Sequence, residues 1–217
     1  MKNKAFDLVV FDMDGTLMDS MTCLADWLHR AVKDYCPSSV TPATITSAFG
    51  PTEEQIIAKF VPKGLVPQCL NAYYKLYERE HDRVFVYPGI DKLLKAVRDQ
   101  GIPMALCTGK SRRAVEISLK RLGWELYFKS VITGNDTKRF KPDPEGLNLI
   151  LGQIPAARKR TIFIGDAAAD TVAAHNANII SGRAEWGLPG LSPKLNTQPD
   201  YKFTIPQDAI NFISVQP

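Results

Sequence analysis

Apolar residues fall into short runs without polar alternation, which is typical of strands buried on both faces of a parallel sheet. The predicted strands cover residues 5–10, 102–107, 131–134, 161–166, 178–181 and 201–204. Elsewhere, apolar residues recur at three- and four-residue spacing and predict amphipathic helices. These helices cover residues 90–98, 111–123 and 206–212. Because strands and helices alternate, we predict an α/β fold with an open, parallel, doubly wound sheet of Rossmann-like topology.

The segment 19–83 interrupts this alternation, because its pattern is helical and contains no convincing strand. Ser20 can cap a first helix that Pro37 ends, and Thr52 precedes a second. A third helix is predicted over 68–80. These helices form too small a unit for an ordinary separate domain, so we interpret them as an insertion after the first strand. The core then consists of residues 1–18 and 84–217.

Three tyrosines lie on one side of the third predicted helix: Tyr73, Tyr74 and Tyr77. Aromatic residues at this spacing are more often core than ligand contacts, and we predict that they pack inside the insertion. Contact with a substrate is the alternative, which helical spacing does not decide.

Length and composition suit one substantial core with a small accessory unit, since the chain has 217 residues and is 45% hydrophobic. No apolar run approaches the roughly 20 residues of a membrane span, and the first strand leaves no room for a signal peptide. We therefore expect a cytoplasmic protein without membrane contact. The four cysteines lack a C-x-x-C pair and indicate neither zinc nor disulfides. Cys107 is predicted to be a buried thiol.

Charge is distributed unevenly along a chain whose net charge is +4. Residues 110–141 hold nine Lys or Arg against three Asp or Glu, whereas residues 19–86 hold seven against eight. A positive field near the later strands suits a small anionic substrate. Nucleic acid is disfavoured as a partner, because no interleaved aromatic residues accompany the basic ones.

The pair Asp12 and Asp14 directly follows the first predicted strand, in the stretch FDMDGT. In a strand, residues two apart share a face, so both carboxylates should point into the same space. Such carboxylates repel each other unless a cation or a proton intervenes. The arrangement favours a functional site over the alternative of turn or N-cap aspartates.

A second acidic pair, Asp166 and Asp170, follows the strand 161–166. If a helix begins near Asp166, both carboxylates lie on one face and can point toward one cation. Magnesium prefers a site with few carboxylates, in which waters and a substrate phosphate supply the other ligands. The alternative is a capping aspartate followed by a solvated one.

The stretch DMDGT after an apolar strand, followed in order by Thr108, Lys141 and Asp166, resembles the motifs of the haloacid dehalogenase-like phosphohydrolases. The resemblance covers nearly the whole chain and is strongest to the phosphoglycolate-phosphatase-like branch. It implies that Asp12 attacks phosphorus to form an aspartyl-phosphate. Asp14 is then the acid that protonates the leaving oxygen and the base that activates water.

The resemblance also implies that Thr108, Gly109 and Lys141 bind the phosphate. Mg²⁺ is then held by Asp12, the main-chain carbonyl of Asp14 and Asp166. Asp170 supports these ligands without touching the ion. Two positions depart from the family pattern: Gly109 stands where Asn or Ser is common, so a side-chain donor is missing, and Ala167 replaces a hydroxyl residue.

The insertion 19–83 resembles the small helical cap of this branch. Its residues Gly50, Thr52 and Glu53 are expected near the leaving group. The pair Trp186 and Gly187 resembles an aromatic-Gly pair that we interpret as packing.

We therefore expect a magnesium-dependent phosphatase acting on a small phosphorylated metabolite, such as a phosphoglycolate-like ester, a sugar phosphate or a nucleotide. A phosphosugar mutase of the same fold is one alternative, although Thr16 and the acidic Glu53 depart from that pattern. The lack of a cap lysine near Glu53 likewise argues against a phosphonoacetaldehyde hydrolase. A non-catalytic phospho-acceptor resembling response-regulator receivers is another alternative, although receivers are about half this length and lack the cap. The sequence leaves monomer and homodimer equally open.

Overall fold

A computed structural model describes residues 5–37, 39–187 and 197–214. Its centre is a six-stranded sheet in the order β5-β4-β1-β6-β7-β8, with every neighbouring pair parallel. The strands are β1 (Leu8–Phe11), β4 (Met104–Cys107), β5 (Phe128–Ile132), β6 (Thr161–Gly165), β7 (Ile180–Ala184) and β8 (Tyr201–Phe203). The predicted parallel α/β core is confirmed, with strand boundaries that differ by a few residues from the sequence pattern.

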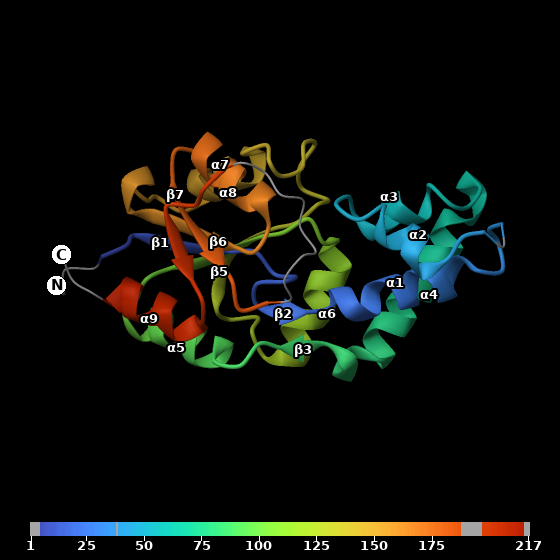
Figure 1. Ribbon diagram of the computed structural model, residues 1–217, viewed down its shortest axis with the longest axis horizontal. Coiled ribbons are helices and arrows are strands. Elements are labelled where there is room, and N and C mark those ends of the chain that lie inside the picture. The colour runs from blue at the N-terminus through green and yellow to red at the C-terminus, as the bar shows by residue number, and fades with distance from the viewer. Residues whose placement is uncertain (1–4, 38, 188–196, 215–217) are drawn as a thin grey trace.

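Helices cover both faces of the sheet (Figure 1). On one face lie α7 (Glu145–Gln153) and α8 (Ala168–Asn176). On the other lie α5 (Ile90–Asp99), α6 (Arg112–Leu122) and α9 (Pro206–Ser214). Because side chains alternate along a strand, Leu8 and Val10 of β1 pack with the first group while Val9 and Phe11 pack with the second. This explains why β1 is apolar at every position.

The central strand β1 lies between β4 and β6, and this position fixes where a ligand can bind. Phe11, the last residue of β1, pairs with Leu106 on one side and Ile164 on the other. The polar residues that follow these three strands therefore meet at one edge. Connections leave in opposite directions there, and such switch points are where open α/β sheets bind ligands.

Four of the helices between β1 and β4 form a separate group beside the sheet, at the right of Figure 1. They are α1 (Met21–Val32), α2 (Pro42–Thr46), α3 (Glu53–Ile57) and α4 (Val66–Arg79). Single 3₁₀ turns lie at Lys63–Leu65 and His81–Arg83. Thr52 caps α3 as predicted, accepting a hydrogen bond from the Gln55 N–H at 3.4 Å. The helix α2 was not predicted.

A two-stranded antiparallel ribbon joins this helical group to the sheet. It pairs β2 (Met18–Asp19) with β3 (Phe85–Val86). The prediction that residues 19–83 contain no strand was wrong at Asp19, because a two-residue strand is too short to leave a periodic pattern. The division into a core and a cap of residues 19–83 stays a prediction, and its two boundaries fall at this ribbon.

The three tyrosines of α4 are buried, as expected of core residues. Their hydroxyls reach polar partners outside α4: Tyr74 donates to Ser111 Oγ at 3.0 Å, and Tyr77 lies 2.6 Å from Ser118 Oγ. Both serines are on the α6 side, so the tyrosines also connect the helical group to the core. No helix among the described residues is both long and apolar enough to cross a membrane.

Candidate active site

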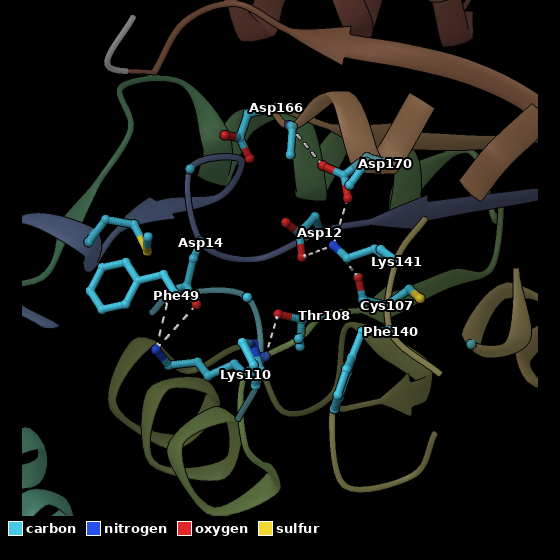
Figure 2. Close-up of a pocket in the computed structure, with 18 of the residues that line it drawn as sticks. Asp12, Asp14, Phe49, Cys107, Thr108, Lys110, Phe140, Lys141, Asp166 and Asp170 are labelled. Atoms are coloured by element: carbon cyan, nitrogen blue, oxygen red, sulfur yellow. Dashed lines mark hydrogen bonds and ion pairs between the residues drawn. The ribbon is translucent and has the colours of Figure 1, made fainter. Parts of the chain in front are cut away.

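A cavity of about 380 Å³ opens at the carboxyl edge of the sheet, where the helical group approaches it. The motif residues expected from the sequence line it together (Figure 2). They are Asp12, Asp14, Thr108, Gly109, Lys141, Asp166 and Asp170. These residues follow four neighbouring strands, β5, β4, β1 and β6, or lie in the first turn of α8, which is why they are far apart in sequence.

Asp12 directly follows β1, and only 7% of the residue is exposed. Its main-chain N–H donates to Ile164 O at 2.9 Å, which ties the residue to β6. Its Oδ1 lies 3.0 Å from Nζ of Lys141. Burial raises the pKa of Asp12 above its ordinary value, and Lys141 only partly opposes this effect. An anionic Asp12 thus depends on cationic neighbours.

Three carboxylates converge at the top of Figure 2, where oxygens of Asp12, Asp166 and Asp170 lie within 4.8 Å of one another. Burial raises the pKa of Asp166, and repulsion from Asp170 and Asp12 raises it further. Thr16 donates a hydrogen bond to Asp166 Oδ1 at 3.2 Å. The cluster carries more acidic groups than its surroundings neutralise.

The prediction that Asp166 and Asp170 share one face of a helix was wrong. The helix α8 begins at Ala168 and leaves Asp166 in the preceding loop. Asp170 is 2% exposed and lies in the first turn of the helix. Its Oδ2 accepts a hydrogen bond from the Ala167 N–H at 2.9 Å, which aims the other oxygen into the cluster. The two aspartates meet through this turn and not through a shared helical face.

The carboxylate of Asp14 points away from the cluster, contrary to the expectation that it shares a space with Asp12 (Figure 2). The strand ends at Phe11, so the alternation of strand side chains does not extend to residue 14. Asp14 instead accepts a hydrogen bond from Ser20 Oγ at 2.5 Å and lies 3.2 Å from Nζ of Lys110. The sequence suggested that Ser20 caps α1, but its hydroxyl makes no capping hydrogen bond because it is used by Asp14.

Lys141 lies between two members of the cluster. Its Nζ is 3.0 Å from Asp12 and 2.6 Å from Oδ1 of Asp170. Burial alone would lower the pKa of Lys141, but the two carboxylates raise it well above the ordinary value. The ammonium therefore stays charged beside the predicted nucleophile.

Thr108 and Gly109 form the opposite wall. The Thr108 Oγ1 accepts a hydrogen bond from the Lys110 N–H at 3.3 Å. A Cβ added to Gly109 would lie 3.1 Å from the carbonyl oxygen of Gly50. The missing side chain at residue 109 thus allows the Gly50 loop to approach the core closely, which gives the departure from the family pattern a structural reason.

The three residues expected near a leaving group are placed differently from one another. Gly50 and Glu53 line the cavity, whereas Thr52 faces a separate pocket. The Glu53 carboxylate accepts hydrogen bonds from the Ser111 N–H at 2.9 Å and from the Tyr73 hydroxyl at 3.1 Å. Apolar residues of the helical group line the rest of this side: Met21, Leu24, Phe49 and Ile56.

The acidic cluster fits a divalent cation. Burial, together with repulsion from the neighbouring carboxylates, raises the pKa values of Asp12 and Asp166 although Lys141 opposes the shift. Carboxylate oxygens are hard ligands of the kind that Mg²⁺ prefers, and an ion among them would relieve the repulsion. A metal held here with substrate phosphate therefore suits the donor set.

Two residues of the site escaped sequence reasoning. Lys110, placed two residues after Thr108, is buried in the cavity wall, and the only available signal was this spacing. Gly15 has φ +81°, and a Cβ there would lie 2.6 Å from the Asp166 carboxylate. Its role in admitting Asp166 depends on the tertiary contact. Trp186 packs as expected and donates a hydrogen bond to Thr16 O at 2.8 Å.

The chain resembles known proteins along most of its length. A family model described as haloacid dehalogenase-like hydrolase matches residues 9–183. The chain is 27% identical to the pyrophosphatase PpaX of Bacillus velezensis, with 100% of each chain covered. It is 28% identical to a phosphoglycolate phosphatase of Vibrio cholerae, with 91% of this chain and 92% of that protein covered.

A crystal structure of a predicted phosphoglycolate phosphatase from Haemophilus somnus has the same fold, with a TM-score of 0.80 and 23% identity. The match covers 96% of this chain and 98% of that one. CbbY from Rhodobacter sphaeroides, solved in complex with phosphate, aligns with a TM-score of 0.77 at 16% identity. That match covers 93% and 95% of the two chains.

Proposed function

We propose that this chain, which belongs to the haloacid dehalogenase-like hydrolase family, is a magnesium-dependent phosphatase. In this proposal it hydrolyses a small-metabolite phosphomonoester through an aspartyl-phosphate on Asp12. One observation carries the proposal. Asp12, Thr108, Lys141 and Asp166, which come from separate motifs, all line one cavity at the switch point of the sheet. The names of the relatives, a pyrophosphatase and a phosphoglycolate phosphatase, support phosphoryl chemistry.

In the first step, an oxygen of Asp12 attacks phosphorus and the bond from phosphorus to the leaving oxygen breaks. Asp14 gives its proton to that oxygen, and the alcohol departs. In the second step, Asp14 removes a proton from water, whose oxygen attacks the phosphoryl group. The bond to Asp12 breaks, its electron pair returns to the carboxylate, and inorganic phosphate leaves. Asp14 then holds the proton for the next cycle.

The phosphoryl oxygens would be bound by the Thr108 hydroxyl, the backbone at Gly109 and the Lys141 ammonium. Lys141 lies 3.0 Å from Asp12, where its charge reduces repulsion between the nucleophile and an anionic substrate. Asp12, Asp166 and the main-chain carbonyl of Asp14 would hold Mg²⁺, with Asp170 supporting them. When bound, the ion would supply positive charge against the phosphoryl oxygens.

We further propose that residues 19–83 act as a cap over the cavity. The apolar residues of this group form one wall, and the ribbon of β2 and β3 is its connection to the core. A cap would exclude water while the leaving group departs and then release products.

A panel of phosphate esters tests the function: phosphoglycolate, sugar phosphates, nucleoside monophosphates and pyrophosphate. Released phosphate is measured with Mg²⁺ and after chelation, for the wild type and for Asp12→Asn. We expect release by the wild type only when Mg²⁺ is present, and none by the variant. Asn keeps the shape of Asp12 but cannot form the acyl phosphate, so undiminished release by a folded variant would refute the assignment.

A further inference from the structure

Lys110 is a buried cation with no part in the mechanism above. It lies in the loop between β4 and α6, and its side chain is 1% exposed. Its Nζ lies 3.2 Å from Oδ2 and 3.4 Å from Oδ1 of Asp14. It also lies 3.3 Å from the Oγ of Ser20, which itself donates to Asp14. Two donors thus fix the Asp14 carboxylate on the side away from the acidic cluster.

Further groups hold the Lys110 ammonium in place. Glu53 Oε1 of α3 lies 3.8 Å from Nζ, and the Tyr77 ring centroid lies 4.8 Å away. Burial by itself would lower the pKa of Lys110, but Asp14, Tyr77 and Glu53 raise it well above the ordinary value. A buried ammonium is tolerated only with such partners. Lys110 therefore remains charged, and its position is determined from several directions.

Orientation matters for Asp14 in particular. A general acid or base has to lie within hydrogen-bond reach of the oxygen it serves, and a small misplacement costs much of the rate. Asp14 lies outside the strand and directly precedes the turn that begins at Gly15, so the backbone alone does not fix its side chain. Side-chain contacts have to do so.

We propose that Lys110 is a positioning residue that, together with Ser20, holds the Asp14 carboxyl in the orientation required for proton transfer. This inference rests on the proposed function. Glu53 of α3 contacts the same ammonium and also accepts the Ser111 N–H at 2.9 Å. The orientation of Asp14 is therefore linked to the position of α3 against the core.

With p-nitrophenyl phosphate as the substrate, loss of a positioning residue and loss of a structural residue affect the two chemical steps differently. In the first step, the bond from phosphorus to the phenolic oxygen breaks and p-nitrophenolate leaves without needing a proton. Asp14 then releases its unused proton to solvent, and in the second step the carboxylate still has to take a proton from water as the aspartyl-phosphate bond breaks. Rapid mixing measures the first step as a burst of p-nitrophenol and the second as the steady-state rate.

For Lys110→Met we expect a burst rate within about threefold of the wild type and a steady-state rate lower by about 10²-fold, the usual contribution of a placed acid or base. Phosphoenzyme should accumulate and be visible as an added phosphoryl group by intact mass. Ser20→Ala leaves every charge in place, so it separates positioning from electrostatics. It should show the same pattern with a loss of roughly tenfold, as for one hydrogen bond to a charged group.

Lys138→Met is the matched control, because it removes an exposed lysine from the Lys- and Arg-rich residues 110–141, which also contain Lys110. It should leave both phases unchanged. Thermal unfolding of each variant reports whether it folds, and if Lys110→Met does not fold, Ser20→Ala decides the question. The inference is overturned if burst and steady state fall in equal proportion, if only the burst falls, or if neither changes. No phosphate release by the wild type with Mg²⁺, either from p-nitrophenyl phosphate or from any ester of the panel, would instead refute the proposed function, and this inference with it.

Discussion

Lys141 and Asp170 form a close ion pair, with Nζ 2.6 Å from Oδ1, although 29 positions separate them in the chain. The pair places a single ammonium beside an acidic cluster whose other members, Asp12 and Asp166, have raised pKa values. One lysine does not balance three carboxylates. The site is therefore built for a second source of positive charge.

Replacing Asp170 by Asn should weaken metal binding without unfolding the protein. The amide oxygen can still accept the Ala167 N–H, but the charge facing Lys141 and the cluster is lost. Groups that support metal ligands in this way contribute about 10–100-fold to affinity. We expect the Mg²⁺ concentration for half-maximal phosphatase activity to rise by that factor. An unchanged Mg²⁺ dependence would show that Asp170 does not support the ion.

Magnesium should stabilise the folded protein against heat, because only the folded state brings the carboxylates together. At a free concentration of about 100 times Kd, one site contributes ~2.7 kcal/mol, or roughly 5–10 °C in Tm for a chain of this size. Asp166→Asn should lose most of this shift, since it removes one ligand charge. Differential scanning calorimetry with Mg²⁺ or chelator provides the measurement, and an equal shift in the variant would place the ion elsewhere.

Substituting Gly15 should damage both stability and the site. An alanine Cβ would lie 2.6 Å from the Asp166 carboxylate, at a backbone φ of +81° that disfavours side chains. The backbone conformation alone costs about 1–2 kcal/mol, so Gly15→Ala should lower Tm and also the Mg²⁺-induced shift. Gly152→Ala is the matched control. No atom lies within 4 Å of a Cβ there, and alanine in the helix α7 should raise stability slightly.

Acid should destabilise the protein partly through His81. Burial and the nearby charges of Lys110 and Arg121 lower the pKa of His81 from 6.5 to about 4 in the folded protein. Between these values the unfolded chain binds more protons than the folded one, so stability falls as pH is lowered through this window. His81→Gln retains a polar group for Ser118 Oγ, which lies 2.9 Å from His81 Nε2.

The His81→Gln variant should therefore lose less Tm than the wild type when the pH is lowered from 6.5 to 4. Thermal melts of both proteins across this range give the difference directly. Parallel curves would show that His81 does not titrate differently in the folded and unfolded states.

The sequence alone determined the α/β core and the residues that follow its strands. Apolar runs such as the one preceding Asp12 are local signals of burial on both faces, and the order of Thr108, Lys141 and Asp166 along the chain is readable without a fold. Thr52 was likewise recognisable as a helix cap, because a capping box involves only neighbouring residues. Such features depend on residues close in sequence, or on motif order.

The tertiary structure decided which way the functional side chains point. Asp14 turns toward Lys110 and Ser20 because β1 ends before it, and Gly15 is required by the carboxylate of Asp166, 151 positions away. Strand periodicity predicts direction only as far as the strand continues. Beyond its end, orientation is set by contacts between distant segments that leave no periodic trace in the sequence, and these contacts placed Asp14 beside Lys110.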